Sequence, residues 1–237
     1  MQEHALTAPR AHGAGAPRHH FFLHGLASSP QSGKATYLTQ QLSRHHVALR
    51  CPDLNQPDFS TLTVTRMLDQ VEEAIRELSP APTVVFGSSL GALVALHLAE
   101  RADKDGGPPV AGLVLLSPAL EFGTNRTRLG EEGLARWRDT GWLEMTHHAD
   151  GDVRRLHYEL FLDASRYDSF ATTNEVPTVI VQGRQDDVVD PSMVERFASP
   201  RSHVRLVVVD DGHQLKDSLD VVWTETCSFL EIDPSVP

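Results

Sequence analysis

Short apolar runs alternate along this chain with longer stretches in which apolar residues recur at helical spacing. The apolar runs predict strands over residues 20–23, 47–49, 83–86, 112–116, 178–181 and 204–209. The stretches between them predict helices that begin near residue 33 and cover 61–78, 90–102 and about 216–230. Continuously apolar strands that alternate with amphipathic helices are typical of an α/β fold, a mostly parallel sheet with helices on both faces.

One long segment interrupts this alternation. Residues 121–175 combine charged and turn residues with scattered aromatic side chains. Because the segment begins just after a predicted strand and ends just before the next, we interpret it as a mostly helical cap inserted into one domain of residues 19–237. The alternative is a surface excursion without a role at the site. Residues 1–18, which are rich in Ala, Gly and Pro and lack an apolar leader, predict a flexible tail.

The composition narrows the class of protein. The chain has 32 acidic and 21 basic residues, a formal net charge of −11, and no dense cluster of Lys or Arg, which argues against nucleic acid as a partner. No apolar run approaches the roughly 18 residues of a membrane span. The two cysteines, Cys51 and Cys227, exclude a disulfide scaffold. Without an export signal, they predict a cytoplasmic protein.

Residues 87–91 read Gly-Ser-Ser-Leu-Gly and match the pattern G-x-S-x-G. In this pattern a strand turns sharply into a helix, and the serine at the apex projects above the end of the sheet. Gly87 and Gly91 provide the small flanks that such a turn needs. Because an apolar strand precedes the pattern and a helix follows it, Ser89 is the predicted nucleophile. The alternative is a Gly-Ser turn that only closes a βα unit.

A serine hydroxyl needs a base, and on this architecture the acid and the histidine follow the serine in that order. The last predicted strand is followed closely by His213, which is the predicted base. The strand before it is followed by Asp186, Asp187 and Asp190. Asp186 is preferred as the acid because it is the first carboxylate after the turn. We interpret Asp187 as a surface residue and Asp190, which precedes a proline, as the cap of the next helix.

Main-chain amides complete the predicted site, because a tetrahedral intermediate needs donors for its oxyanion. The amide of Leu90, next to the nucleophile, is one predicted donor. The amide of Leu26, behind Gly25 in the loop after the first strand, is the other. No metal or other cofactor is expected, since the adjacent histidine pairs at 19–20, 45–46 and 147–148 lack the spacing of metal ligands. Lys34, near the start of a predicted helix, could pair with a carboxylate; the alternative is a solvated side chain.

These residues resemble the serine-hydrolase branch of the α/β-hydrolase family over about residues 20–230. The stretch from Leu23 to Ala35 is similar to small bacterial YqiA-type esterases, whose loop reads HG-x-x-SSP-x-S-x-KA. The GSSLGG elbow of that subgroup is matched by Gly87 to Gly91, and its Asp-x-Val-x-Asp run and C-terminal Gly/Asn-His are matched by Asp186, Val188, Asp190 and Gly212-His213. Two departures are Ala92 in place of the second elbow glycine and the long insertion.

The resemblance implies esterase or thioesterase activity on acyl substrates, and it supports Ser89, Asp186 and His213 together with the Leu26 and Leu90 amides. We expect a cofactor-independent serine hydrolase that cleaves small carboxylic esters of short to medium acyl chain. The alternatives are a thioesterase or acyltransferase with the same triad, and a binding protein of the same fold that has lost catalysis.

Overall fold

The computed structural model describes residues 18–78, 80–123 and 129–234. The strands are β1 (His19–Leu23), β2 (Leu49–Arg50), β3 (Thr83–Ser88), β4 (Val110–Leu116), β5 (Trp142–Thr146), β6 (Val153–His157), β7 (Thr178–Gly183) and β8 (Val204–Val209). The helices are α1 (Gly33–Arg44), α2 (Val64–Arg76), α3 (Leu90–Asp105), α4 (Gly130–Thr140), α5 (Glu159–Ala164), α6 (Pro191–Ala198) and α7 (Leu219–Leu230). Short 3-10 helices are η1 (Phe59–Thr61), η2 (Ser169–Ala171) and η3 (Lys216–Ser218).

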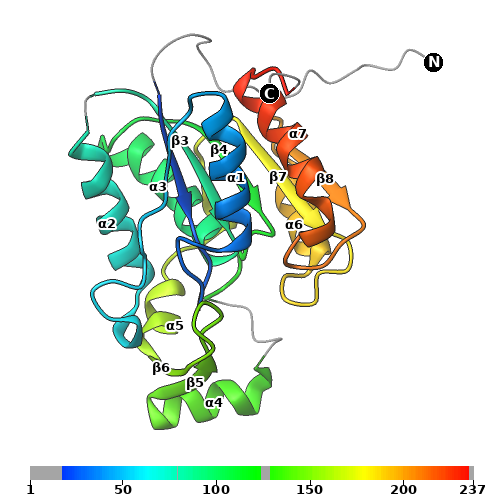
Figure 1. Cartoon of the computed structure of the whole chain (residues 1–237). Coiled ribbons are helices and arrows are strands. Elements are labelled where there is room, and N and C mark those ends of the chain that lie inside the picture. The colour runs from blue at the N-terminus through cyan, green and yellow to red at the C-terminus, as the bar shows by residue number, and fades with distance from the viewer. Residues whose placement is uncertain (1–17, 79, 124–128, 235–237) are drawn as a thin grey trace.

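Six strands form one parallel sheet in the order β2-β1-β3-β4-β7-β8. Parallel strands need crossover connections, and helices supply them here. All carboxyl ends of the strands therefore lie at one edge of the sheet (Figure 1). Open α/β sheets bind their ligands at this edge, so it is the edge that positions the candidate site.

The side chains of β3 are buried along its whole length, as the continuous apolar run predicts. Alternate residues of the strands pack into two separate hydrophobic cores, one on each face of the sheet. Helices α1 and α7 pack with Phe22, Phe86 and Val114 on one face, and helices α2, α3 and α6 pack with Val85 and Leu113 on the other. Figure 1 shows α1 and α7 in front of the sheet, with α2 at its side. The predicted α/β fold is confirmed.

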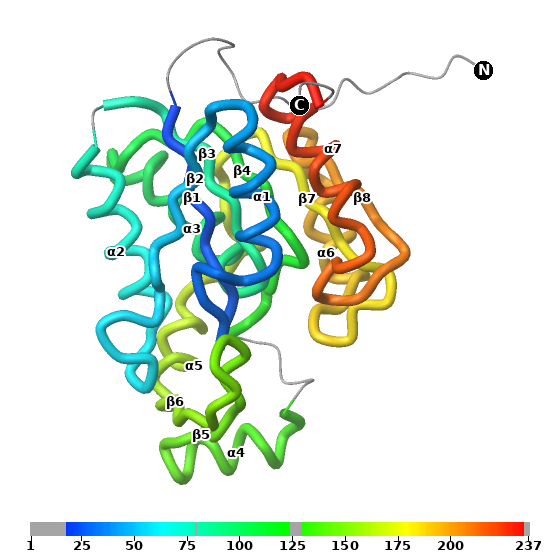
Figure 2. Tube along the Cα trace, in the orientation of Figure 1, coloured from blue at the N-terminus to red at the C-terminus, as the bar shows by residue number. Residues whose placement is uncertain are grey.

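The segment between β4 and β7 forms a separate layer beyond the carboxyl edge of the sheet (Figures 1 and 2). It contains the expected helices, α4 and α5. It also contains an antiparallel hairpin, β5–β6, that the sequence pattern did not indicate. The hairpin turns at residues 147–152, where Asp150 and Gly151 are ordinary turn residues. Its strands alternate only weakly between exposed and covered positions, which explains why their period was not apparent.

Most predicted boundaries agree with the structure to within a few residues. The strand predicted at 47–49 is β2, which is shorter and lies two residues further on at the edge of the sheet, where it pairs with β1. Asp190 accepts a hydrogen bond from the amide of Ser192 at the start of α6, so the predicted cap is confirmed. The predicted tail lies outside the described residues except for Arg18. In the described part of the chain, no helix has the length and apolar character needed to cross a membrane.

Candidate active site

Ser89 lies at the turn between β3 and α3. Its backbone has φ 54° and ψ −118°, a conformation that an L-residue rarely adopts. Helix α3 begins at the next residue, so the serine lies at the positive end of a helix of 16 residues. Amide hydrogen bonds hold the turn in place: Ser89 donates to the carbonyl of Leu116, and Ala119 donates to the carbonyl of Ser89. This is the strained strand-to-helix turn that the sequence pattern predicts.

The glycines of this turn are required by space. A Cβ atom at Gly91 would overlap the carbonyl oxygens of Leu23 and His24 at the end of β1. A Cβ atom at Gly87 would lie 2.5 Å from the Cα of Ala92. A Cβ atom at Gly25 would lie 3.1 Å from the Cβ of Ser89, which places the loop after β1 against the serine. The small residues therefore allow β1, β3 and α3 to approach each other closely.

Asp186 lies in the turn after β7 and its side chain is fully buried. Its carboxylate accepts hydrogen bonds from the amides of Val188 at 2.9 Å and Val189 at 2.8 Å, and from the Gln182 amide group at 2.9 Å. Burial acts to raise the pKa of Asp186, but the hydrogen bonds from His213 and from these amides outweigh it and hold the pKa below its ordinary value. The group is therefore a carboxylate at neutral pH.

His213 follows β8 and contacts this carboxylate. Its Nδ1 atom lies 2.9 and 3.0 Å from the two oxygens of Asp186. Because a carboxylate only accepts hydrogen bonds, Nδ1 carries the proton, and Nε2 of the neutral ring is left as an acceptor. Of the three carboxylates that the sequence offered, the structure brings Asp186 to His213. Asp187 is exposed, and Asp190 caps α6.

A chain of contacts brings the His213 segment towards the serine. The ammonium group of Lys34, at the start of α1, donates to the carbonyl of His213 at 3.1 Å. The loop that leads from β1 to Lys34 also holds Gly25, which borders Ser89. The structure describes both Ser89 and His213, and no hydrogen bond joins the Ser89 hydroxyl to the His213 side chain. Catalytic hydrogen bonds of free enzymes are often long and shorten when substrate binds.

The predicted oxyanion donors are two main-chain amides, one next to Ser89 in the chain and one next to Gly25. Among the described residues, none accepts a hydrogen bond from the amide of Leu26 or of Leu90. The Leu26 amide belongs to the same peptide group as the carbonyl of Gly25. This carbonyl lies 2.9 Å from Nδ1 of His24, so the histidine ring fixes the direction in which the Leu26 amide points.

The contacts of His24 also define its proton. The amide of Leu54 donates to its Nε2 atom at 3.0 Å, so Nε2 is an acceptor and Nδ1–H is the donor to Gly25. Burial lowers the pKa of His24 below its ordinary value despite the hydrogen bond to Gly25 and the nearby Asp53 carboxylate. The ring is therefore neutral and has one tautomer. These contacts make His24 part of the scaffold of the loop after β1.

Backbone strain gathers at the same edge of the sheet. Of six described non-glycine residues with a positive φ, four lie in the segments that follow strands, namely Ala27 after β1, Ser89 after β3, Ser117 after β4 and Leu215 after β8; His46 and Glu231 follow helices. Such conformations cost on the order of 1–3 kcal/mol each and cluster at functional sites. Their distribution is an independent indication that this edge carries the function.

Three residues at this edge were missed or misinterpreted. Gln182 holds Asp186, and a polar residue in an otherwise apolar strand was a signal for it. Gly183 has no room for a Cβ atom, which would overlap the carbonyl of Asp211. Of the two alternatives for Lys34, the solvated side chain is wrong, because the residue is only 7% exposed. Lys34 lies four residues before Leu38, on the buried face of α1, and that spacing was the signal.

The insertion contacts the loop that carries the Leu26 amide. The amide of His148, in the turn of the β5–β6 hairpin, donates to the carbonyl of Ala27 at 2.7 Å. The neighbouring His147 ring is buried and packs edge-on against Phe59 with 5.3 Å between ring centres. The hairpin turn therefore contacts the loop after β1 that carries the Leu26 amide.

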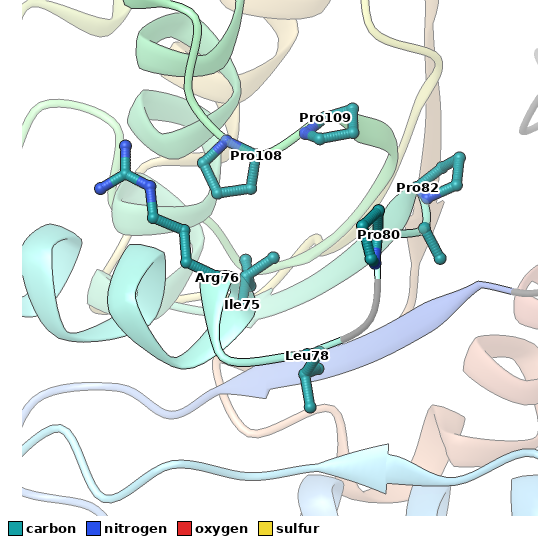
Figure 3. Close-up of a pocket in the computed structure, with 8 residues that line it drawn as sticks. Ile75, Arg76, Leu78, Pro80, Pro82, Pro108 and Pro109 are labelled. Atoms are coloured by element: carbon teal, nitrogen blue, oxygen red, sulfur yellow. The ribbon is translucent and has the colours of Figure 1, made fainter.

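Metal-ligand clusters and pockets elsewhere in the fold could also mark a site. Within the described ranges, no group of three or more His, Cys, Asp or Glu residues is arranged to hold a metal ion. A pocket of about 430 Å³ lies between the end of α2 and the loops before β3 and β4 (Figure 3). Its lining is mostly apolar and includes Pro80, Pro82, Pro108 and Pro109. It lies at the amino ends of the strands, at the edge opposite Ser89, and contributes nothing to this chemistry.

Known proteins resemble this chain in sequence and in fold. The uncharacterized protein Rv2307c of Mycobacterium tuberculosis H37Rv is 31% identical over 148 residues, which are 61% of this chain and 42% of that protein. The chain spans less than half the length of the curated relatives it matches. Est1E of Butyrivibrio proteoclasticus, solved with ferulic acid bound, is 20% identical with a TM-score of 0.74, over 94% of this chain and 92% of that chain.

Alpha/beta hydrolase domain-containing protein 10 from mouse is 19% identical with a TM-score of 0.69, over 89% of this chain and 88% of that chain. At these identities the two solved structures show the fold, which is the α/β-hydrolase fold. The model of the family described as "Uncharacterised protein family (UPF0227)" matches residues 19–230. The predicted resemblance to the small YqiA-type α/β-hydrolases is thereby confirmed, and the chain belongs to the UPF0227 family.

Proposed function

We propose that this protein is a serine hydrolase that cleaves small carboxylic esters with Ser89, His213 and Asp186. The observation that carries the proposal is the pairing of His213 Nδ1 with the buried Asp186 carboxylate at the sheet edge where Ser89 occupies a strained turn. Such a pairing orients an imidazole as a base and stabilises its charged form. The fold of the family accommodates many functions, so the proposal rests on these residues and not on the fold.

We propose one role in the reaction for each of these side chains and amides. The Nε2 atom of His213 takes the proton of the Ser89 hydroxyl as the serine oxygen attacks the ester carbonyl. The negative charge on the carbonyl oxygen is bound by the amides of Leu26 and Leu90, aided by the positive end of α3. The imidazolium, stabilised by Asp186, then gives its proton to the departing alcohol.

An acyl group is left on Ser89 after this step. Water attacks the acyl carbonyl, and His213 again removes a proton from the attacking oxygen. The same two amides bind the second oxyanion, and the carboxylic acid leaves as Ser89 regains its proton. Atoms balance with water as the only co-substrate, so the reaction needs no cofactor.

The purified chain is tested on p-nitrophenyl esters of increasing acyl length beside a panel of acyl-CoA thioesters. We expect hydrolysis of the esters, with the largest kcat/KM for short to medium chains. Faster hydrolysis of the thioesters would replace the ester assignment by a thioesterase, and acyl transfer to an added alcohol in preference to water would indicate an acyltransferase. No turnover of either panel would favour the binding protein.

The oxyanion loop is tested through His24, because its Leu26 amide has no side chain to change. We expect His24→Leu to lower kcat by about 10²-fold, as expected for loss of one oxyanion donor, with little change in KM. His24→Asn, which keeps a donor beside the Gly25 carbonyl, should lose less. Stopped-flow or steady-state assays with a p-nitrophenyl ester measure both, after thermal unfolding has shown that the variants fold. A wild-type kcat in His24→Leu would remove His24 from this role.

The proposed compartment is the cytoplasm. Cys51 and Cys227 are free thiols in the structure. Unpaired cysteines are the usual state in a reducing compartment, which supports the proposal.

A further inference from the structure

Lys34 is a buried cation at the back of the proposed triad. It belongs to the first turn of α1, and its Nζ atom donates to the main-chain carbonyl of His213, 179 residues further along the chain. The residue is 7% exposed. Lysine is almost never buried to this extent unless it is paired. The proposed reaction gives no role to this residue.

Two buried carboxylates lie near this ammonium group. Asp186 is in the loop after β7, and Asp211 is in the loop after β8. Asp211 accepts hydrogen bonds from the amides of Gly212 and Asp217 at 2.6 and 2.8 Å, so it orders the loop that carries His213. Asp186 thus contacts the His213 ring itself, and Asp211 contacts the backbone of the loop that carries it.

The negative charge of two carboxylates acts against the neutral form that an imidazole base needs. Negative charge near an imidazole favours its protonated form, yet a base must be neutral before it can take a proton. An ammonium group at the same place offsets one of the two charges. The remaining charged residues of the loop after β8, Asp210, Lys216 and Asp217, have exposed side chains, where water and salt screen them.

We propose that Lys34 is a positioning residue for the proposed triad: its ammonium group holds the His213 main chain and offsets the negative charge of Asp186 and Asp211. The inference rests on the proposed function and adds to it a residue that holds the segment of the base and balances the charge around it. Burial lowers the pKa of Lys34 to about 8, although both carboxylates act to raise it. The side chain is therefore mostly charged at pH 7, as the role requires.

Four variants separate charge from hydrogen bonding. Lys34→Gln removes the charge and keeps an amide donor, Lys34→Met removes both, and Lys34→Arg keeps the charge. Lys216→Gln is the matched control, because it removes the same charge three residues from His213 at an exposed position. The readouts are the pH dependence of kcat/KM on a p-nitrophenyl ester and the NMR titration of the His213 ring. The ring signal is assigned by its absence in His213→Asn.

We expect the acidic limb of the pH profile and the NMR midpoint to move upward by about one pH unit in Lys34→Gln and Lys34→Met. Both should stay at the wild-type position in Lys34→Arg and Lys216→Gln. Lys34→Met should also lose about tenfold in kcat relative to Lys34→Gln, because the His213 carbonyl loses its donor. A purely structural lysine would change stability and leave both midpoints in place.

The proposal is overturned if the NMR midpoint of Lys34→Gln equals that of Lys216→Gln. It is also overturned if Lys34→Gln and Lys34→Met fail to fold, since the lysine then serves the fold alone. The NMR titration needs no substrate. A wild-type protein that hydrolyses no ester would therefore refute the proposed function while the titration still decides the role of Lys34.

Discussion

Ser89→Ala is expected to abolish ester hydrolysis, with a loss in kcat on the order of 10⁴-fold or more, because the attacking oxygen is removed. Labelling by a fluorophosphonate probe, which traps an activated serine, should disappear in the same variant. The fold should remain intact, since alanine occupies less space and the strained φ of 54° is already present in the wild type. Circular dichroism and thermal unfolding measure this directly.

Ser88→Ala is the matched control for this experiment. Ser88 is the buried serine immediately before the apex, at the end of β3, and differs from Ser89 in backbone conformation and direction. We expect Ser88→Ala to keep its probe labelling and most of its rate. Full activity in Ser89→Ala, or loss of labelling only in Ser88→Ala, would remove Ser89 from its proposed role.

Asp186→Asn is the second substitution with a large expected effect, a loss in kcat of about 10⁴-fold. The Asn side chain presents an NH₂ group as well as an oxygen at the place of the carboxylate. If the NH₂ group faces Nδ1 of His213, the imidazole proton moves to Nε2, and the atom that should accept the Ser89 proton is blocked. The charge that stabilises the imidazolium is lost as well.

Asp187→Asn separates this effect from a general change of charge in the same turn. Asp187 is the next residue, and its side chain is exposed. Steady-state kinetics and the rate of fluorophosphonate labelling should fall in Asp186→Asn and remain near the wild type in Asp187→Asn. The opposite ranking would assign the acid to Asp187 and contradict the contact with His213.

The fold and the strained turn that carries Ser89 could be predicted because their signals are local. A continuous apolar run identifies β3, and the small residues beside Ser89 are adjacent to it in the sequence. The choice of Asp186 over Asp187 was harder, because the two are neighbours. The choice depends on a turn in which the Asp186 carboxylate accepts hydrogen bonds from the amides of Val188 and Val189.

Other features depend on contacts between distant segments. The burial of Lys34 requires the loop after β8 to close over α1, and no pattern near Lys34 specifies that loop. The orientation of the His24 ring likewise depends on the amide of Leu54, which comes 30 residues later. The β5–β6 hairpin was not predicted because both strands are partly exposed and lack a clear alternation. These three features could therefore be identified only from the tertiary structure.

Asp186 and His213 follow the last two strands of the chain, β7 and β8, and this order also bears on synthesis of the protein. As the chain leaves the ribosome, Ser89 emerges long before its acid and its base. A nascent chain that stops before His213 holds a serine without a base, and β8 must still add to the edge of the sheet. The proposed hydrolysis therefore requires that β8 has paired with β7, so translation would delay the reaction until the sheet is complete.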